Sequence, residues 1–251
     1  KISGGVGLRA INIVMKRELD SYFSTHLAYV FILIFLVLSG VFTFYLGNFY
    51  ERGQADLLPF FNFHPWLYLF LVPALSMRLW AEELKSGSIE LLLTLPVTIV
   101  DAVVGKFLAA WIFAGISLMM TFPLWLTVNY LGDPDNGVIF TSYIGSWLMA
   151  GSFLAIGSCM SALSKSQVIA FILCGVVCLL FVLAGYPLVL NSIKTWVPLV
   201  VVDSVASLSF LNHFNSISRG IISLRDVLYF CSVQVVWLAA TVVVINARQS
   251  R

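Results

Sequence analysis

Six long stretches without a charged residue constrain this chain more than any other feature of its sequence. Each is mostly apolar, and about 20 helical residues are enough to cross the ~30 Å hydrocarbon core of a bilayer. The stretches therefore predict membrane spans at about 27–50, 57–77, 107–132, 138–163, 167–190 and 227–247. This pattern indicates an all-α, polytopic membrane protein with six transmembrane helices.

The composition agrees with a chain that has lipid as its main solvent. Hydrophobic residues make up 60% of the chain and charged residues 10%, whereas soluble domains contain about 25% charged residues. Little sequence remains between the predicted spans, so we expect a single transmembrane domain over residues 1–251. The charges scattered through the first 20 residues leave no apolar core for a cleavable signal peptide, so none is predicted.

The distribution of basic residues predicts the orientation of the spans. If the N-terminus lies inside, ten Lys and Arg residues fall on the inner side and four on the outer side, as the positive-inside rule requires. The inner set is Lys1, Arg9, Lys16, Arg17, Arg78, Lys85, Lys106, Lys165, Arg248 and Arg251, and the outer set is Arg52, Lys194, Arg219 and Arg225. We therefore expect a multi-pass protein of the bacterial cytoplasmic (inner) membrane with both termini in the cytoplasm.

Two segments outside the spans carry patterns of their own. In residues 8–23 the apolar side chains recur at steps of three and four, and Lys16 and Arg17 fall off that stripe, which predicts an N-terminal interfacial amphipathic helix. Segment 191–226 lies on the outer side and is too apolar for a free loop. It should form short helices that rest on the outer leaflet or cap the bundle, so membrane lipids are expected to contact both segments.

The spans offer little chemistry of their own. His64 is the only ionisable His, Asp, Glu, Lys or Arg inside the windows, and it either touches substrate or sits at the membrane interface. Cys174 and Cys178 share a helix face without a nearby His or carboxylate, which indicates apolar filler and no metal site. The phosphate-binding motif G-x-x-x-x-G-K-[ST] is absent, so the chain is not expected to be an enzyme or to hydrolyse ATP. No sequence feature indicates binding to nucleic acid.

Small residues line one face of the fourth predicted span, at Gly151, Ala155, Ser158 and Ala162. Small side chains let helix backbones approach closely in a membrane. The face can serve packing within one chain or packing across a dimer, and the sequence favours the first.

A charged, amphipathic segment separates the second and third predicted spans. Residues 78–88 include several charged residues and a glycine, and an apolar run follows until Pro96, so the segment cannot cross the membrane. Ser88 can cap a helix with Glu90 in its first turn, and Pro96 can end it. We expect a coupling helix over residues 82–96 that docks on a soluble partner, with a simple solvated loop as the alternative.

These residues resemble ABC-2-type permeases, particularly the gliding-motility type. The resemblance rests on the run Ala81-Glu82-Glu83-x-Lys85-x-Gly87-Ser88-x-Glu90-Leu91-Leu92-x-Thr94-x-Pro96, on Gly105-Lys106-Phe107 and on Lys16-Arg17-Glu18. Further matches are Asn212-His213-Phe214, Ile217-Ser218-Arg219-Gly220 and Leu224-Arg225-Asp226 ahead of the last span.

The resemblance implies a six-span subunit that works with a second permease copy or a homologous permease, and with a dimer of cytoplasmic ABC ATPases. ATP and Mg would be bound by the ATPase, and this chain would hold no cofactor. The residues implied to contact the ATPase are Lys16, Arg17, Glu18, Glu82, Glu83, Lys85, Gly87, Ser88 and Glu90.

The sequence therefore predicts the permease subunit of an ABC transporter, driving substrate export or mechanical work across the membrane. The sequence does not identify the substrate, and an extracytoplasmic accessory subunit remains a candidate partner. The alternative functions are a non-transporting membrane scaffold for an ATPase or extracytoplasmic complex, and an intramembrane enzyme or secondary carrier. The lack of polar residues at mid-membrane depth argues against an intramembrane enzyme and against a secondary carrier.

Overall fold

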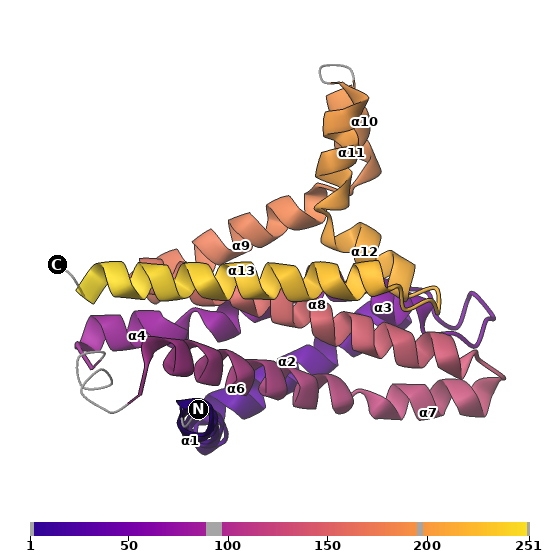
Figure 1. Ribbon diagram of the computed structural model, residues 1–251. Helices are drawn as coiled ribbons and strands as arrows, with labels where there is room; N and C mark the ends of the chain where they lie inside the picture. The colour runs from indigo at the N-terminus through magenta and orange to yellow at the C-terminus, as the bar shows by residue number, and fades with distance from the viewer. Residues whose placement is uncertain (1–2, 89–96, 195–197, 250–251) are drawn as a thin grey trace.

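The protein is a bundle of helices in the computed structural model, which describes residues 3–88, 97–194 and 198–249 (Figure 1). Within these ranges the chain forms helices and no strand, which confirms the predicted all-α class. The predicted coupling residue Glu90 and the end of its segment, through Pro96, lie outside the described residues.

Five helical segments of the described chain are long and apolar enough to cross a membrane. They are Ala28–Leu46, Leu58–Ser86, Ile99–Leu131, Asn136–Leu163 and Leu224–Arg248. These correspond to five of the six predicted spans and confirm a polytopic membrane protein.

The fifth predicted span, 167–190, is shorter than expected. Helix α9 (Gln167–Leu183) is apolar but has only 17 residues. The chain turns after it, and α10 (Pro187–Lys194) begins with a proline, whose ring and missing N–H prevent α9 from continuing. The turn is close-packed, because a Cβ on Gly185 would lie 2.0 Å from the Ser209 Oγ.

The first half of the chain follows the predicted spans with shifted boundaries. Helix α1 (Ser3–Ser24) precedes α2 (His26–Val41), which continues as the π-helix η1 (Phe42–Leu46). Helix α3 (Leu58–Ser76) leads into α4 (Arg78–Ser86). Helix α6 (Ile99–Met119) begins eight residues before the predicted third span, at 99 against 107, because Thr98 and Asp101 form a capping box. Helix α7 (Phe122–Leu131) completes that span after a break.

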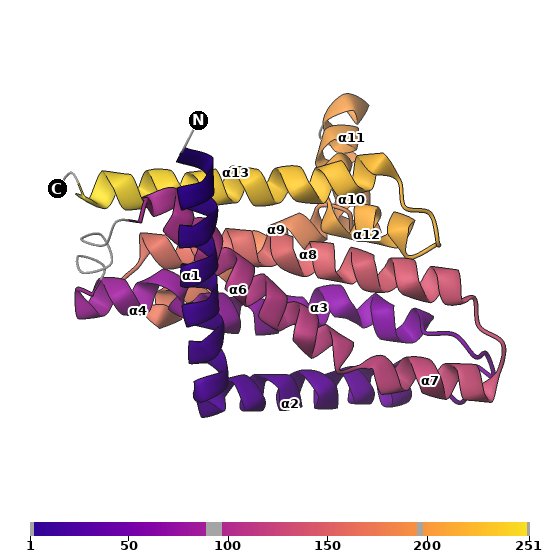
Figure 2. The same ribbon diagram turned by 60° about the horizontal axis from the view of Figure 1, so that its bottom comes forward.

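Helix α8 (Asn136–Leu163) forms the centre of the bundle, packed against α3, α6, α9 and α13 (Leu224–Gln249) (Figure 2). Its predicted small-residue face is buried within this one chain. A Cβ on Gly151 would lie 2.6 Å from Gln234 and 2.7 Å from Trp111, so glycine permits a close approach of α6 and α13. This confirms packing within the chain as the use of that face.

His64 lies in the core of the bundle and is fully buried, so its ring contacts neighbouring helices and is not on the surface of the protein. The Ser146 hydroxyl lies 2.8 Å from its Nδ1, and Tyr68 lies 2.7 Å from the same hydroxyl. Phe35 and Phe60 surround the ring, with Phe60 edge-on at 4.3 Å between centroids. Because the ring is fully buried, its predicted contact with substrate gains no support here.

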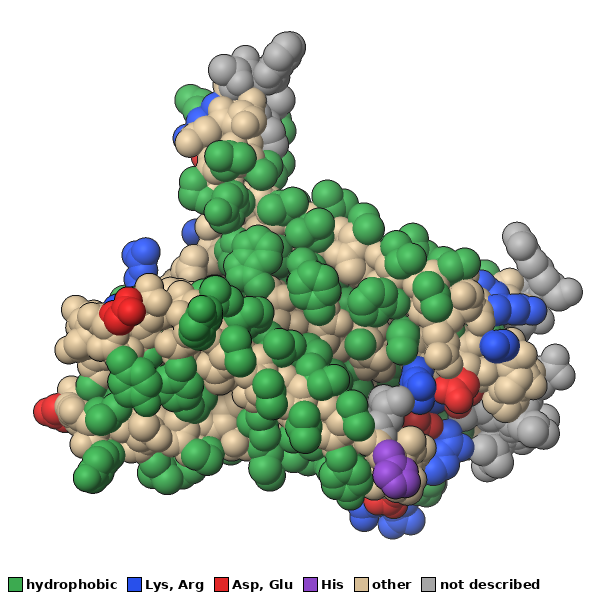
Figure 3. Space-filling model, turned by 180° about the vertical axis from the view of Figure 1, so that it is seen from behind, with side chains coloured by type: hydrophobic (Ala, Val, Ile, Leu, Met, Phe, Trp, Pro, Cys, Tyr) green, Lys and Arg blue, Asp and Glu red, His purple; other side chains and the backbone are tan. Residues whose placement is uncertain are grey.

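The two ends of the bundle differ. Helices α1 and α4 lie toward the same end as the C-terminus, and Lys and Arg side chains are concentrated there, whereas hydrophobic side chains cover the middle (Figures 1 and 3). Toward the other end, α10, α11 (Leu199–Ser207) and α12 (Phe210–Ile217) occupy most of the segment predicted to form short helices. Helices α10 and α11 project sideways from the bundle (Figure 1).

Candidate coupling interface

The charged segment that was predicted as one coupling helix over 82–96 begins earlier and is interrupted. Helix α4 starts at Arg78, directly after α3, and ends at Ser86. Gly87 has φ +73°, a left-handed conformation that glycine adopts without steric cost and that ends a helix. Ser88 therefore follows a helix end, and its hydroxyl lies 2.8 Å from the Ser86 hydroxyl.

Helix α4 is fixed to the C-terminal end of α8 by two serines. Its N-cap residue, Met77, provides no side-chain cap, and the Ser161 hydroxyl of α8 takes over that role. It accepts hydrogen bonds from the backbone N–H groups of Trp80 and Ala81, each at 3.0 Å, and donates to the Met77 carbonyl at 2.9 Å. The Trp80 indole donates to Ser158 Oγ at 3.0 Å. These bonds satisfy otherwise unpaired groups at the start of the helix.

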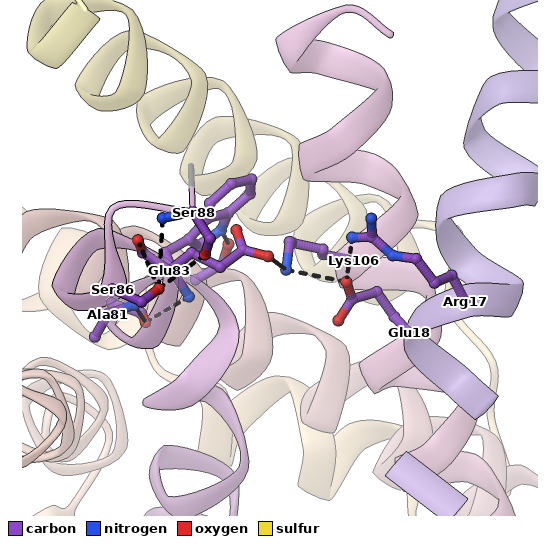
Figure 4. A network of polar contacts seen from close by, with 10 residues as sticks. Arg17, Glu18, Ala81, Glu83, Ser86, Ser88 and Lys106 are labelled. Carbon is purple, nitrogen blue, oxygen red and sulfur yellow. Dashed lines mark hydrogen bonds and ion pairs between the residues drawn. The ribbon is translucent and has the colours of Figure 1, made fainter. Parts of the chain in front are cut away.

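A buried lysine on α6 joins α4 to α1. Lys106 Nζ lies 2.8 Å from Glu83 Oε1 on α4 and 3.2 Å from Glu18 Oε1 on α1 (Figure 4). Glu18 also accepts a hydrogen bond from Arg17 at 2.8 Å. The Lys106 side chain is only 3% exposed and its ammonium lies 5.2 Å from the Trp80 ring centroid, a cation–π distance. We call Glu18, Glu83 and Lys106 the charge joint.

The cations beside Glu18 offset the cost of burying its carboxylate. Burial by itself would raise the pKa of the Glu18 carboxyl, but the Lys106 ammonium and then the Arg17 guanidinium outweigh it, so that pKa is lowered. Glu18 is therefore held as a carboxylate. Burial, with help from the charge of Glu18, raises the pKa of Tyr22 one turn further along α1.

Helix α1 packs closely along α6, so the charge joint is one part of a larger contact. A Cβ on Gly105 would lie 2.8 Å from the Val14 Cβ, which means that only glycine lets the two backbones approach this far. Further along, the Tyr22 and Phe113 rings stack with 5.3 Å between centroids. Figure 2 shows α1 lying crosswise to the long helices α2 and α13, as an interfacial helix should.

The residues predicted to contact an ATPase fall into two groups. Glu18 and Glu83 point inward, with side chains 17% and 21% exposed, and pair with Lys106. The exposed members are Lys16, Arg17, Glu82, Lys85 and Gly87. Ser88 is half-buried, and Glu90 lies outside the described residues.

Sequence reasoning missed Lys106 as part of the site, although it was counted among the inner cations. The usable signal was its position: a lone lysine directly before an uninterrupted apolar stretch, within the Gly105-Lys106-Phe107 match. The contacts of Ser158 and Ser161 with α4 were also missed, because a serine in an apolar span gives no sign of which distant N–H group its hydroxyl accepts from.

The fold and this interface define a multi-pass membrane protein with a charged, structured element between its second and third long helices. The family model of the ABC-2 family transporter protein matches residues 67–247. The chain therefore belongs to the ABC-2 transporter family, as a permease component of an ABC transporter. No curated protein matches the chain.

Proposed function

We propose that this chain couples ATP hydrolysis by a separate cytoplasmic ABC ATPase to substrate export or to mechanical work across a bacterial inner membrane. ATP and Mg would be bound by the ATPase, and both termini of this chain would lie in the cytoplasm. The gliding-motility type is the subtype that its motifs resemble. The family relationship supports an ATPase partner in general terms.

The charge joint is the observation that carries this proposal. A partner that moves α4 acts on Glu83, and Glu83 is bound to Lys106 on α6 and, through it, to Glu18 on α1. Ser161 adds a direct link from α4 to the central helix α8. A movement of the short helix α4 would thereby be transmitted to the three longer helices α1, α6 and α8.

The exposed charges beside the charge joint offer the docking surface. Glu82 and Lys85 lie on α4, and Lys16 lies on α1. From the part of the chain that the structure describes, Glu82 accepts one long hydrogen bond, 3.5 Å, from Gln167 on α9, so it remains available to a partner.

Co-purification with the P-loop ATPase tests this proposal. Combined reversal of charge, Glu82→Lys with Lys85→Glu, should abolish ATPase binding while the chain still accumulates in the membrane. The matched control is Arg52→Glu with Glu51→Arg, at two adjacent exposed residues in the loop between η1 and α3, which should leave binding unchanged. Full ATPase binding by the Glu82/Lys85 variant would contradict the docking surface. A wild-type chain that binds the ATPase without changing its turnover would favour the scaffold.

We further propose that two permease chains, identical or homologous, form the complex, with α2 as one contact. Only 17% of the apolar window Ala28–Leu46 is buried within the chain. Val37, which is 54% exposed on α2, provides a position for cysteine crosslinking between two copies. A complex mass that fits one permease per two ATPases would refute this stoichiometry.

A further inference from the structure

Helices α10 and α11 form an arm that needs an attachment to the bundle. The two helices pack on each other and project away from the long helices (Figures 1 and 2). Leu188 on α10 and Val200 on α11 are 71% and 76% exposed, so much of the arm's apolar surface is not used within the chain. The pose of the arm therefore depends on contacts at its base.

The base of the arm is held by side chains that cap the C-terminal end of α11. The Asn212 amide donates to the Ala206 carbonyl at 2.8 Å. The Ser207 carbonyl lies 2.9 Å from His213 Nε2, and the Tyr229 hydroxyl donates to the Leu208 carbonyl. The last carbonyls of a helix have no partner in the helix and carry partial negative charge, so they attract donors, and cations best of all.

His213 is placed so that both of its ring nitrogens face acceptors. Nδ1 lies 2.6 Å from the Asp226 carboxylate, and Nε2 faces the Ser207 carbonyl. A neutral imidazole has only one N–H, whereas the imidazolium has two. Only the protonated ring can therefore donate to both oxygens. The ring is 8% exposed in its side chain and stacks on Tyr229 at 3.9 Å between centroids.

We propose that His213 and Asp226 form a protonation-dependent latch that fixes the pose of the α10–α11 arm. The titratable groups in contact with His213 are Asp226 and Tyr229 of α13, α11 contributes the Ser207 carbonyl, and Phe230 of α13 is the other neighbouring ring. With both protons present, the latch ties α11 to α12 and α13. Loss of one proton sets a nitrogen lone pair against a carbonyl oxygen and removes one of the hydrogen bonds at the base, so the arm is held less tightly. The latch thus holds at acidic pH and loosens as pH rises.

This inference does not depend on the proposed coupling function. His213 and Asp226 come from motifs before the last span that the coupling interface does not use. The two sites also lie on different helices, so either can fail without the other.

Distance measurements between spin labels on the full chain in lipid nanodiscs test the latch. Labels at Val200→Cys on the arm and Ile222→Cys beside the start of α13 report the arm's pose, since both positions are exposed. The exposed native thiol is removed by Cys231→Ser. Histidine changes charge between about pH 5 and pH 8, so spectra are compared at those two values.

We expect one narrow distance at about pH 5 and a broadened or second component at about pH 8. His213→Gln, which cannot be protonated, should show the broadened distribution at both values. Asp226→Asn gives an independent variant that removes the carboxylate and should also lose the narrow distance at low pH. Arg225→Gln, an exposed neighbour, is the matched control and should behave as the wild type.

Two results would overturn the latch. One is an identical narrow distance at both pH values in the wild type. The other is a pH response that persists in His213→Gln, because a different group would then be titrating. If His213→Gln fails to accumulate, Asp226→Asn decides between the same outcomes.

Discussion

The substitution Lys106→Met should destabilise the protein more than any surface change at the same end of the bundle. It retains the length and apolar stem of the side chain but removes the charge that lies between Glu18 and Glu83. Those two carboxylates would then remain without their shared counter-ion, and one oxygen of Glu83, Oε2, already has no hydrogen-bond partner within the described residues. The loss is therefore an electrostatic one, with little change in packing.

The magnitude follows from the burial of the three partners. Removing one member of a fully buried ion pair costs about 3–5 kcal/mol. Glu18 and Glu83 keep 17% and 21% of their side chains exposed, so water compensates part of this loss, and we expect roughly 2–3 kcal/mol. For a chain of this size, about 2–4 °C per kcal/mol gives a Tm lowered by roughly 5–10 °C.

Thermal unfolding followed with a thiol-reactive fluorophore in a Cys231→Ser background measures this loss, because Cys159, Cys174 and Cys178 are buried until the bundle opens. Lys165→Met, at an exposed lysine, is the matched control and should shift Tm little. The triple variant Lys106→Met, Glu18→Gln, Glu83→Gln should recover most of the stability, since it leaves no unpaired charge. If Lys106→Met unfolds like the wild type, or the triple variant is as unstable as the single one, the reasoning about the charge joint is wrong.

Three further changes test the surroundings of the charge joint. Gly105→Leu should force α1 away from α6, since even a Cβ would lie 2.8 Å from Val14, and limited proteolysis should then release α1. Ser161→Ala should lower the free energy of unfolding by roughly 1 kcal/mol, measured by the same thiol assay, because the first N–H groups of α4 lose their acceptor. The stabilisation that Glu18 gains from its lowered pKa is present at neutral pH and is lost as pH falls through that lowered value, so acidification to below the usual pKa range of a glutamate should loosen α1 in the wild type but not in Glu18→Gln.

The class of fold could be predicted from the sequence because the bilayer imposes a length on apolar helices. Charge-free windows locate five of the long helical segments directly. They failed at 167–190, where apolar composition continues past the end of α9 into α10 and only Gly185 and Pro187 mark the turn. Hydropathy indicates how favourably a segment partitions into lipid. It does not indicate whether the segment forms one continuous helix across the bilayer.

The coupling interface could be predicted in location but not in detail. Charge and Gly between two spans indicate an exposed, structured element, and the described helix α4 lies there. The pairing of Glu83 with Lys106, 23 positions further along, depends on how α4 folds back on α6. The sequence also gives no sign that Glu18, 88 positions before Lys106, completes the same contact. Such long-range pairs are set by tertiary packing, so local patterns could not separate inward-facing from exposed charges.

Because Glu83 faces inward and Glu82 is exposed, reversing the charge of one tests something different from reversing the charge of the other. Reversing Glu83 places a cation beside Lys106 in a site where water has little access, so it would disrupt the chain itself before it tested any partner. Reversing Glu82, which is exposed, tests the partner and leaves the charge joint intact. A loss of ATPase binding in the first variant therefore carries no information about docking unless the second shows it too. If the reversals of Glu82 and of Glu83 each abolish binding and only the reversal of Glu83 lowers Tm, α4 acts as a positioned element whose orientation, set by Lys106, presents Glu82 and Lys85 to the ATPase.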